Sequence, residues 1–279
     1  MPPRRWMTLL LVFTLAACGP TASSVDLTPA TPTTVQLRGR LTFAGSTTVQ
    51  PLVDKLGGVF HQRNPEVGLE IAAGGSVVGI KAIHQGTTDI GMSSRALHAA
   101  ELDGISTHQI ASDVLAVVVN PANPLQTLSQ DQLIDIYLGT ITNWRELGGA
   151  DLPITVVVRE ESSGTRGAFD EIALRNQAPL APQISVGITA GDVAALVTND
   201  VGAIGYVGFG NVESSLRTVA IDGVVPSVAT VRDGSYRLVR PLLLLTGPLS
   251  QPLAQAFIDF VLSDEGQRLV AEDGWVPVR

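Results

Sequence analysis

The chain has 279 residues, a formal net charge of -8 at neutral pH and a single cysteine. One cysteine excludes a disulfide within the chain, so the hydrophobic core has to hold the fold together. The acidic charge argues against nucleic acid or an anionic membrane surface as the partner.

The N-terminal region predicts an exported protein. Residues 1–17 form a signal peptide, in which two arginines precede an apolar stretch, residues 7–15, that is too short to span a bilayer. The segment Leu15-Ala16-Ala17-Cys18 resembles a lipobox, so we expect Cys18 to carry lipid and to become the new N-terminus. Residues 18–37 are rich in Thr, Pro, Ser and Ala, which is typical of an extended tether. Removing the two arginines with the signal peptide changes the formal charge to -10.

The remaining chain has the pattern of an α/β protein. Short β-branched runs alternate with amphipathic helical stretches, which indicates mostly parallel sheets. Ser129 and Gln132 form a capping-box pattern at one helix start. In chain order, we predict strands at residues 41–44, 69–72, 89–92, 114–119, 154–158 and 203–206, and helices around 49–60, 76–83, 129–137, 191–199, 252–262 and 263–274. We expect the apolar run at 236–245 to carry the chain back to the first domain.

The turn after the strand at 154–158 is the most informative segment. Arg159 is followed by Ser163, Gly164 and Thr165, and then by an amphipathic helix start at 167–172. Free backbone N–H groups and the helix dipole favour an anion at such a position, hydroxyls add donors, and an arginine can bind two oxygens. An ordinary helix N-cap beside a surface arginine uses the same residue types and is the alternative interpretation.

Three further turns have a similar composition. They are residues 45–48, 74–76 and 93–95, and each follows a predicted strand. In open α/β sheets, ligands bind beyond the carboxyl ends of the strands, so these turns can converge on one crevice. We therefore expect a cleft between two lobes that is lined by hydroxyls, backbone amides and arginine. Four independent N-caps are the alternative.

The sequence contains no common catalytic motif. Gly-x-Ser-x-Gly, the phosphate-binding loop ending in Gly-Lys-Ser/Thr, and His-Glu-x-x-His are all missing from it, and its four histidines have no metal-like spacing. We expect no enzyme activity, no catalytic residue, no metal and no cofactor.

The four turns, in this order, resemble those of the phosphate-binding subunit of bacterial ABC phosphate-uptake systems, which has a periplasmic-binding-protein fold. The resemblance runs from about Leu41 to Val278 and rests on segments such as GSTTVQPL, GGSVVGIKAI, DIGMSSR, VVVREESSGTRGAF and GAIGYVGFGN. It implies a type II fold with two lobes, each a mostly parallel sheet flanked by helices. We expect residues 38–118 and 242–279 in lobe 1 and residues 119–241 in lobe 2.

The resemblance also implies a function. We expect a monomer that binds inorganic phosphate outside the cytoplasm, closes at the two strands between the lobes, and delivers phosphate to the transmembrane subunits of an ABC permease. The phosphate-binding residues implied by the four turns are Ser46, Thr47, Thr48, Ser76, Ser94, Arg95, Arg159, Ser163, Gly164 and Thr165.

One position departs from the best-known form of the family. Some members carry an aspartate that accepts the proton of hydrogen phosphate, and this chain has Ser94 there. Fully ionised sulfate has no proton to donate, so an acceptor favours phosphate over sulfate. Asp113 is our candidate for the acceptor. The alternatives are a binding protein for another tetrahedral oxyanion, such as sulfate or molybdate, and a surface phosphatase-like or adhesive protein on the same fold.

Overall fold

The computed structural model describes residues 36–278. The predicted signal peptide, the lipidation of Cys18 and nearly all of the tether lie outside the described residues. None of the helices between residues 36 and 278 combines the length and the apolar character needed to cross a bilayer.

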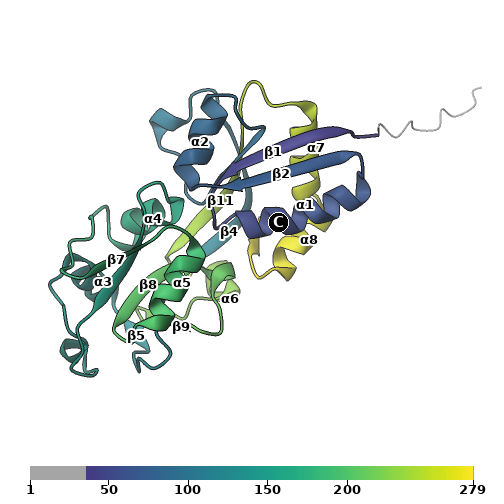
Figure 1. The fold of residues 1–279 in the computed structure, drawn as a ribbon. Coiled ribbons are helices and arrows are strands. Elements are labelled where there is room, and N and C mark those ends of the chain that lie inside the picture. The colour runs from purple at the N-terminus through teal and green to yellow at the C-terminus, as the bar shows by residue number, and fades with distance from the viewer. Residues whose placement is uncertain (1–35, 279) are drawn as a thin grey trace, which may run out of the picture. The chain divides into compact units, whose positions relative to one another are not determined.

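One twisted sheet runs through the described part of the chain (Figure 1). Its strands follow the order β2 (Val67–Ala73), β1 (Gly39–Gly45), β3 (Ile90–Ser93), β11 (Val239–Thr246), β4 (Ser106–Val119), β8 (Ala203–Gly208), β6 (Thr155–Arg159) and β7 (Ile184–Gly187). Two short strands, β9 (Arg217–Thr218) and β12 (Val276–Pro277), also pair with β4. A separate two-stranded sheet joins β5 (Thr127–Leu128) and β10 (Ala220–Ile221).

The sheet is parallel at both ends and antiparallel in the middle. Strand β1 pairs in parallel with β2 and β3, and β6 pairs in parallel with β7 and β8. Strands β4 and β11 are antiparallel to each other, and they join the two parallel parts. Pro241 fits within β11 because the pairing with β3 involves only residues 243–245, so the missing N–H breaks no bond to that strand.

Helices cover both faces of the first parallel part. On one face, α1 (Gln50–Arg63), α7 (Pro252–Val261) and α8 (Asp264–Glu272) bury apolar side chains that include Phe43 and Phe257. On the other face, α2 (Ser76–His84) packs Ile80 and Ile83 against β11. We call this part, with β1 to β3, the first lobe.

The second parallel part is covered in the same way. One face packs against α3 (Gln130–Leu138), α4 (Gly164–Ala168) and a π-helical segment, Phe169–Ala173, and the other against α5 (Ala190–Asn199). We call this part, with β6 to β8, the second lobe. Helix α6 (Val228–Arg232) and single turns at Ala99–Glu101, Trp144–Leu147 and Phe209–Asn211 complete the helical elements of the described residues.

Each of the two middle strands, β4 and β11, contributes residues to the hydrophobic cores of both lobes. On β4, Ala111 belongs to the core of the first lobe and Val114 to that of the second. On β11, Val239 packs on the second core and Leu242 lies in the first. The chain therefore passes between the lobes on β4 and β11, while the expected lobe boundaries at 118/119 and 241/242 stay predictions.

Several local predictions agree with the structure and two are wrong. Ser129 caps α3 in a capping box with Gln132, and the hydroxyl of Ser263 caps α8. Strand β4 starts at Ser106 rather than Val114, because its polar first half pairs with the end of β11. The helix expected to start at residue 167 already starts at Gly164, since Ser163 is its N-cap.

Candidate functional site

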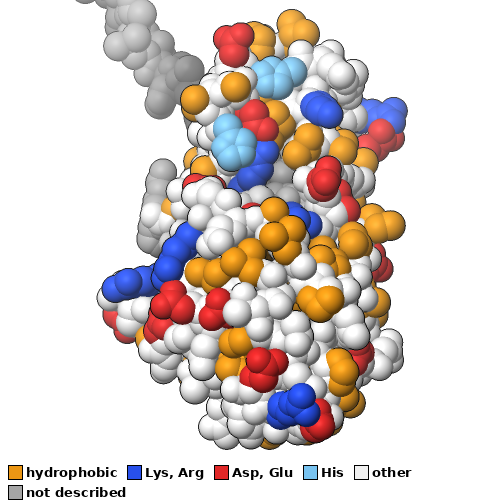
Figure 2. Space-filling view, turned by 90° about the vertical axis from the view of Figure 1, so that its left-hand side faces the viewer, with side chains coloured by type: hydrophobic (Ala, Val, Ile, Leu, Met, Phe, Trp, Pro, Cys, Tyr) orange, Lys and Arg blue, Asp and Glu red, His pale blue; other side chains and the backbone are white. Residues whose placement is uncertain are grey.

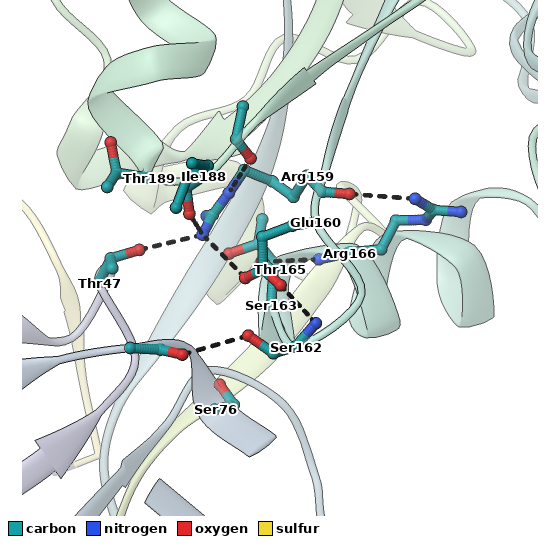
Figure 3. Close-up of polar contacts among 12 residues, drawn as sticks. Thr47, Ser76, Arg159, Glu160, Ser162, Ser163, Thr165, Arg166, Ile188 and Thr189 are labelled. Atoms are coloured by element: carbon teal, nitrogen blue, oxygen red, sulfur yellow. Dashed lines mark hydrogen bonds and ion pairs between the residues drawn. The ribbon is translucent and has the colours of Figure 1, made fainter. Parts of the chain in front are cut away.

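Arg159 is the centre of a polar cluster between the lobes. It ends β6, and its side chain is 2% exposed. Its Nε donates to the carbonyl of Gly187 at 3.2 Å, and its Nη2 donates to the carbonyl of Ile188 at 2.7 Å and to Oγ1 of Thr47 at 3.2 Å. Figure 3 shows the guanidinium extending from the second lobe to Thr47 of the first. The arginine therefore links the turn after β1 to the turn after β7.

A pair of threonine hydroxyls makes a second contact across the junction. Oγ1 of Thr48, just before α1, lies 3.0 Å from Oγ1 of Thr165 in α4, and both residues are buried. Either hydroxyl can be the donor. Because a hydroxyl both donates and accepts, each can exchange this bond for one to a ligand oxygen.

Ser76, Ser94 and Gly164 form the third contact. The N–H of Ser94 donates to Oγ of Ser76 at 3.1 Å, and the two hydroxyls lie 3.4 Å apart. A Cβ added to Gly164 would overlap the hydroxyl of Ser76 and lie 2.8 Å from that of Ser94. Only glycine therefore permits the backbone of α4 to come this close to the first lobe.

At the edge of the cluster, Ser162 of the second lobe forms two hydrogen bonds with the first lobe. Its hydroxyl donates to the carbonyl of Gly74 at 3.1 Å (Figure 3). Its own carbonyl accepts from the N–H of Val77 at the same distance. Ser162 was absent from the predicted site residues although it lies in the Arg159–Arg166 turn. Its contacts involve mostly backbone atoms, for which the sequence carries no signal.

Two of the predicted site serines accept hydrogen bonds from backbone N–H groups of their own turns. Oγ of Ser46 accepts from the N–H of Thr48 at 3.2 Å and from Val49 at 3.4 Å, and Oγ of Ser163 accepts from the N–H of Arg166 at 3.3 Å. Both serines are buried beside the inter-lobe contacts. The N-cap interpretation is thus correct for Ser163, and it coexists with the clustering of the turns.

Arg95 lies beside the cluster, and both terminal nitrogens of its guanidinium already have hydrogen-bond partners. Its Nη1 and Nη2 donate to the two carboxylate oxygens of Glu101, each at 2.7 Å. This bond holds the pKa of the Glu101 carboxyl well below its usual range, at about 2. The expected contact between Arg95 and a ligand stays a prediction.

Asp113, the predicted proton acceptor, is fully buried at the junction. Its Oδ2 accepts from Nε and Nη2 of Arg240 at 2.9 and 2.7 Å, and its Oδ1 accepts from the N–H of Phe209 at 3.0 Å. Burial raises the pKa of the Asp113 carboxyl, and the adjacent guanidinium opposes that rise. The role of Asp113 towards a ligand stays a prediction.

Two residues that the sequence analysis did not single out fix the position of Arg159. The hydroxyl of Tyr206 accepts from the backbone N–H of Arg159 at 3.1 Å, and Nη1 of Arg166 donates to the carbonyl of Arg159 at 3.0 Å. Arg166 is itself held by Asp170, and the ring of Tyr206 stacks on Phe169 at 3.8 Å. The backbone of Arg159 is therefore anchored on both sides.

The positive charge of Arg159 is not neutralised by a close carboxylate, so it is available to an anion. The nearest carboxylate, Glu160, lies 3.9 Å away and uses its other oxygen to accept from Ser162 N–H. Burial lowers the pKa of the Arg159 guanidinium, but an arginine keeps its charge near neutral pH. On the face shown in Figure 2, basic side chains lie singly among acidic ones, so attraction of an anion depends on these local donors.

A larger concavity of the surface lies away from this cluster. It measures about 550 Å³ and is formed by β7 and α5, with Ile188, Asp192 and Leu196 among its lining residues. It contains no arginine, lysine or histidine, so it offers an anion no cation. The chemistry of the junction, rather than cavity size, identifies the candidate site.

Two α/β lobes joined by two strands, with hydroxyls and a buried arginine meeting at the junction, define a two-lobed binding protein for a small oxyanion. The sequence matches the family described as the PBP superfamily domain over residues 28–265. The chain belongs to this superfamily.

Several of its relatives are named as phosphate-binding proteins. The chain is 35% identical over 250 residues to the phosphate-binding protein PstS of Bacillus subtilis, covering 86% of this chain and 81% of that protein. It is 27% identical to PstS of Borreliella burgdorferi, covering 86% and 90%.

Solved structures agree with the sequence comparison. A Clostridium perfringens protein assigned to ABC-type phosphate transport as its substrate-binding protein, crystallised with bound phosphate, shares 38% identity. It matches 86% of this chain and 100% of its own, with a TM-score of 0.81. An ABC-type phosphate transport receptor from Vibrio cholerae shares 33% identity with a TM-score of 0.72, again over 86% of this chain and 100% of its own.

Proposed function

We propose that this protein binds inorganic phosphate outside the cytoplasm and delivers it to an ABC permease. The relatives named above support phosphate as the ligand. The single structural observation that carries the proposal is the bond from Arg159 to Thr47 across the junction, beside the hydroxyl pair of Thr48 and Thr165. A buried arginine surrounded by hydroxyls fits a small oxyanion, because charge and neutral donors together replace its water shell.

Binding would use donors from both lobes. When the lobes part, the bond between Thr48 and Thr165 breaks and Gly164 moves away from the hydroxyls of Ser76 and Ser94, so these hydroxyls become accessible to phosphate oxygens. The donors stay on the ends of strands and helices, so little reorganisation is needed. The residues that we propose for contact are Ser46, Thr47, Thr48, Ser76, Ser94, Arg95, Arg159, Ser163, Gly164 and Thr165.

Closure would take place on β4 and β11. These strands connect the two cores, and the contacts between the lobes consist mainly of hydroxyl and backbone bonds rather than a shared apolar core. Such an interface can open and close at modest cost. The closed form would then be the one that docks on the permease.

Asp113 remains our candidate for the group that accepts the phosphate proton. Its Oδ1 accepts a bond from Phe209, and a carboxylate oxygen has a further lone pair available. We propose no covalent step, so the protein acts as a binding protein and not as an enzyme.

The N-terminus supplies the proposed membrane attachment. Cys18 would carry the lipid, residues 18–37 would tether a monomeric binding domain, and Cys18→Ser should move the protein from the membrane to the soluble extracytoplasmic fraction. Retention of the variant at the membrane would contradict lipid anchoring at Cys18.

Ligand-dependent stability and a turnover assay test the function as a whole. Phosphate should raise the Tm of the purified protein, since a ligand that binds only the folded state stabilises it. A chromogenic phosphate ester should remain intact under the same conditions. Hydrolysis of the ester would instead support a phosphatase-like protein, and a Tm that does not respond to phosphate would contradict phosphate binding.

A further inference from the structure

A second buried arginine lies at the junction of the lobes. The side chain of Arg240 on β11 is 0% exposed, and its partner Asp113 on β4 is equally buried. The two residues are directly opposite each other in the antiparallel pairing of β4 and β11. They thus occupy the segment in which the chain passes between the lobes.

The hydrogen bonds of Arg240 are incomplete. Nε and Nη2 both donate to the same oxygen of Asp113, at 2.9 and 2.7 Å. Among the residues that the structure describes, Nη1 has no hydrogen-bond partner although it is buried. An unpaired donor on a buried cation is costly, and such groups in native proteins call for an explanation.

The guanidinium lies next to the proposed phosphate site. A Cβ added to Gly208, at the end of β8, would be 3.0 Å from Nη2 of Arg240 and 3.0 Å from the methyl group of Thr48. The same Cβ would be 2.5 Å from Oδ2 of Asp113. Because Gly208 has no side chain, Arg240 and Thr48 approach each other over its backbone.

The charge of Arg240 also reaches Arg159. Burial is the main cause that lowers the pKa of Arg159, and the positive charge of Arg240 lowers it further. Two guanidinium groups near one buried junction repel each other, and an anion bound between the lobes would relieve that repulsion.

We propose that Arg240 is a second cationic residue of the anion site. From its position on β11, it would stabilise the bound ligand through its charge and through its unpaired Nη1. The proposal rests on the proposed function, because it assumes that phosphate is the anion. Asp113 holds the guanidinium of Arg240 in place by hydrogen bonds, and the missing side chain of Gly208 leaves space for that guanidinium.

Two variants test the proposal by calorimetry with phosphate. Arg240→Lys keeps a charge that can pair with Asp113 but removes Nη1, and it should weaken phosphate binding about 10- to 100-fold, the factor that one hydrogen bond to a charged group represents. If this variant does not fold, Arg240→Gln removes the charge, leaves the proposed acceptor Asp113 in place and has an amide that can still donate to it, and it should show at least the same loss of affinity. The matched control is Arg268→Lys in the exposed pair with Glu272 on α8, which should keep the affinity of the wild type.

Affinity separates a binding role from a structural one. If the pair of Arg240 and Asp113 only supports the fold, the Arg240 variants should have a lower Tm and the same Kd for phosphate as the wild type. Wild-type affinity in a folded Arg240 variant would therefore overturn the inference while the proposed function stands. A wild-type protein that binds no phosphate would overturn the proposed function, and this inference with it.

Discussion

Nη2 of Arg159, at the end of β6, donates a hydrogen bond to Oγ1 of Thr47 in the turn after β1. The two residues are 112 positions apart in the chain and belong to different lobes. This bond makes the strand-end turns of both lobes parts of one site. It also places a buried cation where hydroxyls of both lobes meet.

Arg159→Ala should abolish measurable phosphate binding. The variant removes the cation and leaves the carbonyls of Gly187 and Ile188 without their donor, so we expect at least a 100-fold (~3 kcal/mol) loss in calorimetry. His84→Ala is the control, since His84 lies exposed at the end of α2, where its Nε2 is 3.2 Å from the carbonyl of Glu101. Equal loss in both variants would point to unfolding or to a wrong position of the site.

Gly164→Ala should hinder closure of the lobes. Its methyl group would overlap the hydroxyl of Ser76, and such overpacking costs about 1 to 3 kcal/mol, which should appear as weaker phosphate binding and a more open form in solution scattering. The matched control is Gly58→Ala in α1, where a Cβ would meet nothing within 4 Å. Phosphate affinity equal to that of the wild type in Gly164→Ala would contradict the close approach of α4 to Ser76.

Asp113→Asn should reduce the preference for phosphate over sulfate. The single oxygen of the amide is needed to accept from Arg240, so the NH2 group, which only donates, takes the place of Oδ1 and hydrogen phosphate loses its proposed acceptor. The ratio of the two dissociation constants is the measurement. A variant that retains full discrimination would remove Asp113 from this role.

Glu101→Gln should destabilise the protein in a pH-dependent way. The pKa of Glu101 is lowered from about 4.5 in the unfolded chain to about 2, chiefly by the bond from Arg95, so its ionised form stabilises the folded state. The difference in unfolding free energy should be about 1 to 2 kcal/mol at pH 7 and should disappear as the pH falls from about 5 to about 2. A constant difference over this range, measured by urea unfolding, would show that the ion pair does not contribute.

Much of the fold follows from local patterns in the sequence. The caps at Ser129, Ser163 and Ser263 use side chains that satisfy free N–H groups within three residues, and such short-range chemistry is visible in the sequence. The first half of β4 was missed because its strand character depends on pairing with β11, and pairing register is not visible in one sequence.

The site was only partly predictable for the same reason. The hydroxyls and Arg159 stood out because donor-rich turns follow apolar strands. The contact of Arg95 with Glu101 and that of Arg240 with Asp113 depend on how the chain returns in space. The carbonyls of Gly187 and Ile188 belong to the backbone, so their bonds to Arg159 could not be predicted from residue types.

Calorimetric titration of the purified protein with phosphate, sulfate, molybdate and a phosphonate tests the central claim most directly. We expect tight binding of phosphate alone, because the donors of Arg159 and the surrounding hydroxyls act together with a proton acceptor. Binding of sulfate with the same affinity as phosphate would contradict the assignment.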